Sequence, residues 1–185
     1  MQFEETELRG AFVIDVDRLE DERGFFGYTF NSDDFAAHGL ETRIVQENIS
    51  YNARRNTLRG MHYQVAPDAQ PKLIRCTQGA VYDVVIDLRP DSATHRNWIG
   101  VELTAENHRM IYVPAGFAHG FQTLQDHTEL LYLMFAPYAP ASARGVRWDD
   151  PAFGVEWPAA DDRIINERDR TYSDYPPDKL SSTDQ

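Results

Sequence analysis

The chain has 185 residues, 42% of them hydrophobic and 12% aromatic, a composition typical of a globular protein with one hydrophobic core. Its formal net charge of −12 opposes long-range attraction to polyphosphates, which disfavours nucleic acid as a partner. The sequence shows no signal peptide and no apolar stretch long enough to span a bilayer, and its single Cys76 allows no internal disulfide, so we expect a cytoplasmic protein.

Short segments rich in β-branched and aromatic residues dominate the sequence and predict strands separated by turns. In chain order the predicted strands cover residues 11–16, 25–30, 42–51, 57–64, 71–78, 80–88, 97–103, 109–113, 118–124 and 128–136. One early helix is predicted at 31–39, because a capping Asn or Ser precedes Asp33 and Asp34 and Gly39 follows. Many short strands without intervening helices predict an all-β sandwich or barrel.

The C-terminal third lacks regular periodicity. From Pro137 onward the chain is rich in Pro, Gly, Asp and Trp, as in GVRWDDPAFGVEWP. Such a segment needs a body to pack on, so we expect a flap over the barrel within a single domain that spans residues 1–185. The polar stretch at about 175–185 is expected to be a frayed tail.

Several polar residues fall on predicted strands where apolar residues would be ordinary. His62 lies on one strand and Lys72 stands among apolar neighbours on the next. Asp83 and Asp87 share a face with valines, and buried carboxylates are costly unless they are paired or used. His119 follows a glycine-flanked turn. A single strand histidine is more often structural than catalytic, so His62 becomes a candidate only together with these other groups.

A metal site is the main alternative of another class. Small cupin-type barrels often bind iron, manganese or zinc through a His-x-His pair, a downstream Glu and a further His. Here Gln64 stands two residues after His62, and Lys72 occupies the region where the Glu would fall. An ammonium in place of a carboxylate makes a poor site for a divalent cation, so we predict no metal and disfavour a metal-dependent cupin enzyme.

Six blocks in series resemble one known family. They are DERGFF, VQENISY, TLRGMHYQ, AQPKLIRCTQGAVYDVVIDLRPDS, VPAGFAHGFQTL and VRWDDPAFGVEWP, and together they span roughly residues 20 to 175. This order and spacing resemble the dTDP-4-dehydrorhamnose 3,5-epimerase family, and blocks in series are more specific than any single motif. The resemblance implies a cupin-like jelly-roll barrel of two antiparallel sheets with short helices. It also implies a homodimer with exchanged N-terminal strands.

The resemblance implies epimerisation at C3 and/or C5 of a nucleotide-linked 4-keto-6-deoxyhexose through an enolate, without cofactor. His62 matches the family's base, and Asp169 matches the carboxylate that orients it. Tyr132 matches the acid on the opposite face of the sugar, and Lys72 matches the group that stabilises the enolate. Without the resemblance, Tyr132 would be interpreted as a core aromatic and Asp169 as a surface charge.

The resemblance also implies a set of substrate-binding residues. It comprises Arg23, Gln46, Asn48 and Arg59 around the diphosphate, His119 in the pocket wall, Tyr138 stacked on the base, and Asp83, Arg168 and Tyr28. Tyr28 departs from the family, which usually has a Glu near the thymine. It is expected either to alter the preference for the base or simply to fill space, with dTDP still the ligand.

Some alternatives stay open at this level. The simple alternation of side chains along a strand places Arg59 and His62 on opposite faces, although the resemblance implies that both lie in one cavity. A bulge at Gly60 could re-aim the chain, or Arg59 could reach around a rim. An enzyme that inverts only one carbon, or that uses another nucleotide, remains the alternative within the class. A binding protein without catalysis is disfavoured, because the base, acid, orienting carboxylate and lysine occur together.

Overall fold

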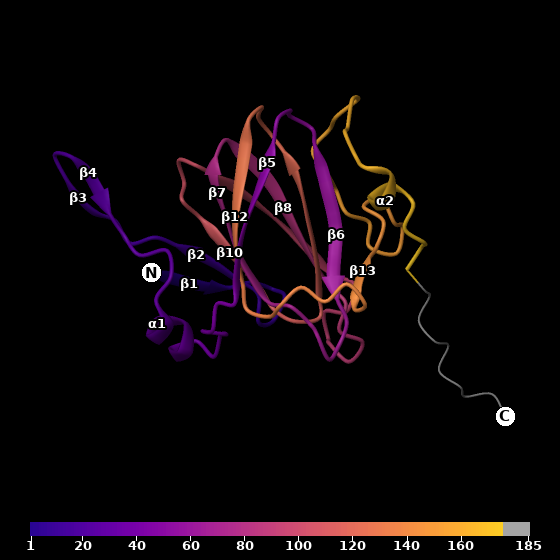
Figure 1. The fold of residues 1–185 in the computed structure, drawn as a ribbon, viewed down its shortest axis with the longest axis horizontal. Coiled ribbons are helices and arrows are strands. Elements are labelled where there is room, and N and C mark those ends of the chain that lie inside the picture. The colour runs from indigo at the N-terminus through magenta and orange to yellow at the C-terminus, as the bar shows by residue number, and fades with distance from the viewer. Residues whose placement is uncertain (176–185) are drawn as a thin grey trace.

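The computed structural model describes residues 1–175 and consists mainly of two antiparallel sheets (Figure 1). One sheet has six strands in the order β1-β2-β10-β7-β12-β5, and the other has five in the order β13-β6-β11-β8-β9. Strands β3 and β4 form a separate hairpin. The strands are β1 Gln2–Glu5, β2 Phe12–Asp15, β3 Leu19–Asp21, β4 Gly24–Phe26, β5 Gln46–Asn52, β6 Leu58–Gln64, β7 Lys72–Gln78, β8 Ala80–Asp87, β9 Trp98–Thr104, β10 Met110–Val113, β11 Phe117–Thr123, β12 Thr128–Met134 and β13 Ala143–Gly145.

The core lies between the two sheets. Ile74 and Cys76 of the six-stranded sheet pack in one cluster with Val81 and Val85 of the five-stranded sheet. Ile74 and Cys76 are two residues apart and Val81 and Val85 are four apart, so the side chains of each pair point to the same face of their strand. The cluster fills the barrel interior. The fold prediction, an all-β barrel of two antiparallel sheets, is confirmed.

The outer faces of the sheets are covered by less regular segments. The predicted C-terminal flap is confirmed, because Val146 and Phe153 pack against Met61 and Val84 on the five-stranded sheet. On the six-stranded sheet, the ring of Phe35 packs in a cluster with β7 and β10 residues. The part of the predicted frayed tail from 176 to 185 lies outside the described residues.

Two short helices are present in the described range. The helix α1, Ser32–Ala37, confirms the prediction: the side chain of Asn31 accepts the amides of Asp33 and Asp34 at 2.9 and 3.1 Å. The helix α2, Glu167–Arg170, was not predicted. Within residues 1–175, no helix is long and apolar enough to cross a membrane.

Some strand predictions were wrong or incomplete. The predicted strand at 25–30 ends at Phe26, and β1, β3 and β13 had no sequence signal. Strand β3 reads Leu-Glu-Asp with every residue exposed, and β1 is mostly exposed, so neither shows an apolar face. These strands exist because a neighbouring strand supplies hydrogen-bond partners, which local pattern does not encode.

The β3–β4 hairpin projects from the barrel (Figure 1). Its apolar side chains are largely exposed to solvent, Leu19 by 67% and Phe26 by 61%. Arg23 lies in the turn, with its side chain 84% exposed and paired to Asp21 at 2.5 Å. An exposed apolar hairpin is a surface that needs a partner.

A bulge at Gly60 puts Arg59 and His62 on one face. His119 pairs with His62 and Phe121 pairs with Arg59, so two steps along β11 match three steps along β6. The extra residue reverses the alternation, and of the two alternatives left open the bulge is the one found. Gly60 has a φ of +124°, and a Cβ there would lie 2.5 Å from Cα of Gly120. Only glycine fits this conformation and this space.

Replacing Gly60 by alanine is expected to destabilise the fold beyond the cost of backbone strain. Gly24 has the same φ of +124° with nothing within 4 Å of an added Cβ, so Gly24→Ala is a matched control. We expect Gly24→Ala to cost about 1–3 kcal/mol and Gly60→Ala about 2 kcal/mol more, because of the clash. Urea unfolding of both variants measures the difference, and equal costs would contradict the role of close packing.

Candidate active site

One buried carboxylate joins two parts of β6. Asp169, 1% exposed, lies with its Oδ1 2.7 Å from Nε2 of His62, while its Oδ2 accepts the backbone N–H of Gly60 at 3.0 Å. The short helix α2 places this residue, because the side chain of Asn166 caps the helix and accepts the amide of Asp169 at 2.7 Å. The imidazole and the bulge are therefore held by the same group.

The electrostatics of this pair fix the tautomer of His62. Burial raises the pKa of Asp169, but hydrogen bonds from His62 and Gly60 outweigh burial and leave this pKa below its ordinary value. The ionised carboxylate can only accept, so Nε2 of His62 carries the proton and donates it. Nδ1 is then the ring nitrogen available as a base, and the side chain of His62 is 41% exposed.

His62 opens onto a cavity of about 290 Å³, which we call the Tyr132 pocket. It lies between the sheets and is lined by Asn48, Ile49, Ser50, Arg59, His62, Lys72, His119, Phe121, Tyr132 and Met134. His62 stands on the five-stranded sheet and Tyr132 on the six-stranded sheet. A small molecule between the sheets would therefore meet an imidazole on one side and a phenol on the other.

Burial tunes three charged or ionisable groups at this pocket. Lys72 is 7% exposed, and burial lowers its pKa to about 8, although Asp83 opposes the shift. Burial also lowers the pKa of His119 and raises the pKa of Asp83. Nε2 of His119 lies 2.8 Å from a carboxylate oxygen of Asp83. The charge of Asp83 thus stands behind the pocket and keeps a cation favourable within it.

Tyr132 is arranged to keep its proton. Burial raises its pKa well above the ordinary value, the charge of Asp83 adds to the shift, and Arg59 opposes it. Its ring meets His119 edge to face with centroids 5.9 Å apart. Within residues 1–175 no hydrogen bond occupies its hydroxyl. A neutral phenol of this kind can donate a proton to a strongly basic carbon but does not act as a resting base.

A second cavity of about 200 Å³, which we call the Tyr138 pocket, continues the first. It is lined by His62, Tyr63, Gln64, Gln70, Lys72, Tyr138, Ala143, Arg144 and Arg168. His62 and Lys72 line both pockets, so the two form one site with two lobes. The second lobe offers an exposed aromatic ring and guanidinium groups, which suit a planar base and an anion.

The predicted binding residues divide into two groups. Those that line one of the two pockets are Asn48, Arg59, His119, Tyr138 and Arg168. Gln46 instead donates to the side-chain oxygen of Asn48 at 2.7 Å. Asp83 has no exposed surface and contacts His119. Arg23 and Tyr28 lie on or just after the projecting hairpin, outside both pockets of this protomer.

Other pocket residues were missed by sequence reasoning. Ser50, Gln70 and Arg144 line the two pockets, although none of them was among the predicted site residues. Arg144 could have been noticed only as a cation in β13, a strand that was itself not predicted. Among residues 1–175, no three His, Cys, Asp or Glu side chains are grouped as a metal ion would require.

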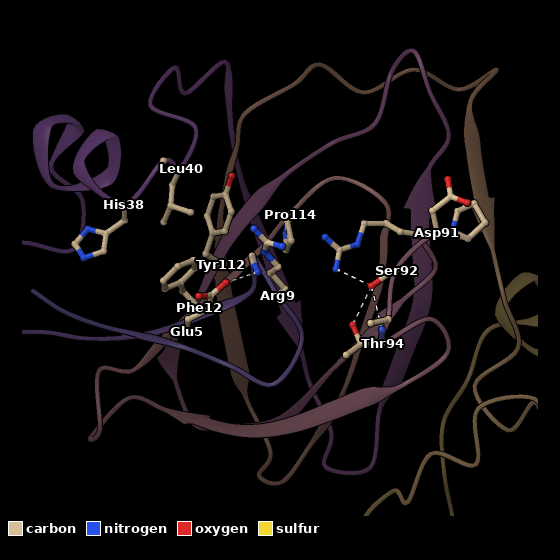
Figure 2. Close-up of a pocket in the computed structure, with 15 residues that line it drawn as sticks. Glu5, Arg9, Phe12, His38, Leu40, Asp91, Ser92, Thr94, Tyr112 and Pro114 are labelled. Atoms are coloured by element: carbon tan, nitrogen blue, oxygen red, sulfur yellow. Dashed lines mark hydrogen bonds between the residues drawn. The ribbon is translucent and has the colours of Figure 1, made fainter.

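A larger cavity, of about 980 Å³, lies elsewhere. Figure 2 shows its wall, which includes Arg9, Tyr112, Pro114 and Thr94. The guanidinium of Arg89 on this wall is already committed, because it donates to the carboxylate of Asp87 at 2.7 Å. Volume alone does not make a catalytic site, and we assign the candidate site to the smaller pockets where the imidazole of His62, the phenol of Tyr132 and the amine of Lys72 converge.

Comparisons with known proteins agree with this geometry. Residues 5–175 match the family described as dTDP-4-dehydrorhamnose 3,5-epimerase. A protein of that name from Methanothermobacter thermautotrophicus is 43% identical over 92% of each chain. The crystal structure of a Bacillus anthracis dTDP-4-dehydrorhamnose 3,5-epimerase with TDP and PPi bound is 39% identical, with a TM-score of 0.89 over 94% of this chain and 99% of that one.

A more distant structure shows that the same fold occurs with a narrower activity. The 3′-monoepimerase ChmJ from Streptomyces bikiniensis, in complex with dTDP-quinovose, is 32% identical. Its TM-score is 0.83, over 89% of this chain and 83% of that one. The likeness to these solved structures also confirms the cupin-like fold that the sequence predicts.

Replacing Asp169 by asparagine tests how the carboxylate supports β6. We expect Asp169→Asn to lower the free energy of unfolding near pH 7 by about 1–3 kcal/mol, through weaker hydrogen bonds to His62 and Gly60. Because the folded-state pKa of Asp169 is lowered, its contribution is present above about pH 4 and is lost as the pH falls through the folded pKa. Urea unfolding from pH 2 to 7 should therefore show a smaller acid-induced loss in the variant than in the wild type. An identical pH dependence would contradict this role.

Proposed function

Because this chain belongs to the dTDP-4-dehydrorhamnose 3,5-epimerase family, we propose that it inverts carbons 3 and 5 of a 4-keto-6-deoxyhexose linked to thymidine diphosphate. The observation that carries the proposal is the Tyr132 pocket. His62 and Tyr132 enter it from opposite sheets, and buried Lys72 stands with them. Inversion at a carbon beside a ketone requires these three functions: a base, an acid on the other face and a cation for the enolate.

The first step is removal of a proton by His62. Nδ1 takes the proton from the carbon beside the ketone, the C–H electrons form a C=C bond, and the carbonyl oxygen becomes an enolate. Lys72, in its ammonium form, stabilises that negative oxygen. Asp169 holds the ring of His62 and favours the imidazolium that results.

The second step returns a proton from the opposite face. Tyr132 donates its hydroxyl proton to the same carbon, the C=C electrons form the new C–H bond, and the ketone is restored. The raised pKa of the phenol keeps it protonated until an enolate is present. Exchange with water then resets Tyr132 and His62. The same steps at the second carbon complete the double inversion.

The two lobes divide the binding of the substrate. We propose that Arg59 and Asn48 contact the diphosphate, while Tyr138 stacks on the base and Arg168 supplies positive charge beside it. Binding energy from this remote handle positions the sugar ring between base and acid. The proposal includes no metal and no cofactor. In its support, the amide of Gln64 is occupied by backbone groups and is not free to replace the second histidine of a metal-binding cupin.

An enzyme that inverts only one carbon is the second candidate. It is favoured by the match to a 3′-monoepimerase, whose fold and size are similar. The same base and acid serve either outcome, so the number of carbons inverted depends on how the sugar can turn within the pocket.

We also propose a homodimer that exchanges its N-terminal hairpins. The apolar hairpin is exposed, and β5 is an edge strand whose outward residues Ile49 and Tyr51 are 64% and 51% exposed. A second copy would cover both surfaces and bring Arg23 and Tyr28 to the partner's pockets. Exposed edges of this kind are otherwise an aggregation hazard.

A cytoplasmic location belongs to the proposal, and the buried free thiol of Cys76 is consistent with a reducing compartment.

Incubation with dTDP-4-keto-6-deoxyglucose in deuterated water, with a chelator present, tests the activity. We expect deuterium at two carbons and conversion to the L-sugar. His62→Ala should lose exchange and conversion by about 10³-fold or more. Tyr132→Phe should keep the exchange of hydrogen for deuterium at the carbon that His62 deprotonates, while it loses most of the inversion. Exchange at one carbon alone would favour the second candidate, and activity that the chelator abolishes would contradict a metal-free mechanism.

The pH dependence of kcat/KM tests the charge of Lys72. Because its pKa is about 8, the ammonium is lost as the pH rises through that value, and kcat/KM should fall above about pH 8. In Lys72→Arg the guanidinium stays charged, so this alkaline decline should disappear even though the rate is lower. An unchanged decline in the variant would assign it to another group.

Mixing two inactive variants tests the exchanged dimer. In the proposed dimer, each site takes His62 from one chain and Arg23 from the other, so Arg23→Ala and His62→Ala remove residues that different chains contribute to a site. If the hairpin is exchanged, a mixed dimer has one intact site, because one chain supplies Arg23 and the other supplies His62. Equimolar co-refolding should recover about a quarter of the wild-type activity, since about half of the dimers are mixed. No recovery, together with a monomer in sedimentation at micromolar concentration, would contradict the proposal.

A further inference from the structure

We propose that Gln64 is a positioning residue that fixes Tyr138 as the platform for the nucleotide base. The inference rests on the proposed function, and it adds a residue that neither contacts the reacting atoms nor binds the ligand directly. Gln64 ends strand β6, two residues after His62, and lines the Tyr138 pocket.

The amide of Gln64 bonds to the backbone on both sides of Tyr138. Nε2 donates to the carbonyl of Pro137 at 3.2 Å, and Oε1 accepts the N–H of Ala139 at 2.8 Å. Nε2 also donates to the carbonyl of Asp68 at 2.6 Å. The peptide groups that flank Tyr138 are therefore both held by one side chain. Such a pair of bonds fixes the direction in which the intervening side chain leaves the backbone.

The burial of Gln64 shows that it acts through Tyr138. The residue is 6% exposed, and both amide hydrogens and the amide oxygen are already engaged. Little of the amide is left for a ligand. Tyr138, by contrast, is 54% exposed and available for stacking. An exposed ring on an irregular segment binds a base well only if its position is preorganised.

The rest of the segment is anchored independently of Gln64. The amide of Phe135 donates to Pro71 at 3.1 Å, and Gln70 donates to the carbonyl of Ala136 at 2.7 Å. At the other end, the backbone N–H of Val65 donates to the carbonyl of Ser142 at 3.0 Å, a bond that does not involve the side chain of Gln64. Loss of the Gln64 bonds should therefore free the middle of the segment, where Tyr138 lies, without releasing its ends.

Gln64→Met tests the proposal, because methionine has a similar volume and makes none of the three hydrogen bonds. Calorimetric titration with dTDP and with inorganic pyrophosphate separates the base from the diphosphate. We expect dTDP to bind about tenfold more weakly, the equivalent of losing one or two hydrogen bonds, while pyrophosphate binding is unchanged. In turnover, KM should rise and kcat should be retained, because His62 and Tyr132 are untouched.

Asn52→Ala is the matched control. Asn52 is also a buried amide, 2% exposed, but its oxygen accepts Nε of Arg59 at 2.7 Å. Its loss should weaken pyrophosphate and dTDP by similar factors. The proposal would be wrong if Gln64→Met, like Asn52→Ala, weakened the binding of dTDP and of pyrophosphate by the same factor. That result would mean that the substitution of Gln64 disturbs the sheet in general.

A double-mutant cycle of Gln64→Met with Tyr138→Ala tests directly whether the effect of Gln64 depends on the ring of Tyr138. If Gln64 acts through the ring, Gln64→Met should add nothing to the loss of dTDP affinity in that background. Full additivity, or dTDP binding by Gln64→Met equal to the wild type, overturns the inference while leaving the proposed function intact. A wild-type chain that binds no dTDP would instead contradict the proposed function and, with it, this inference.

Hydrogen exchange in the wild type provides a test without substitution. The N–H of Ala139 lies in an irregular segment but is bonded to Gln64, so it should exchange slowly. Rapid exchange of that amide would show that the bond is not maintained and would overturn the proposal even if Gln64→Met failed to fold.

Discussion

The site depends on one carboxylate that reaches β6 from the far end of the chain. Asp169 accepts hydrogen bonds from the imidazole of His62, in a partly buried contact, and from the backbone amide of Gly60, in a buried one. The second bond matters as much as the first, because the bulge at Gly60 is what places Arg59 and His62 on one face. The orientation of His62 and the position of Arg59 on the same face thus depend on where a single short helix contacts the sheet.

Burial provides the second organising constraint. A barrel interior disfavours charge, so burial lowers the pKa of Lys72 and raises the pKa of Tyr132, and in both cases the neutral form is favoured. The structure keeps a positive group there by placing Asp83 behind the pocket, bonded to His119. The same low polarity that makes such groups costly would strengthen their action on the enolate of the proposed reaction. The two sheets place His62 and Tyr132, the proposed base and acid, on opposite sides of the pocket, which a single surface could not do.

The ligand site is assembled from segments of very different regularity. The catalytic groups stand on central strands whose positions are fixed by pairing, whereas Tyr138 and Arg168 come from irregular or short elements that need anchors. Buried amides meet that need by bonding to backbone or to guanidinium groups. Arg23 in the hairpin and Tyr28 just after it lie outside both pockets of their own protomer. In the dimer that we propose, they would complete the site of the second copy.

The sequence by itself determined the β architecture, the helix predicted at 31–39 and found at 32–37, and the choice of His62 and Lys72 as candidate site residues, because alternation, caps and misplaced charge are local properties. It also indicated the family through blocks in series. Only the tertiary structure decided that Gly60 forms a bulge and that β13 and α2 exist. The contact of Asp169 with His62 across 107 residues was implied by the resemblance and by no local pattern. The bulge, β13 and this contact each depend on hydrogen bonds between segments that are remote in the chain, and such bonds leave no periodicity in either segment.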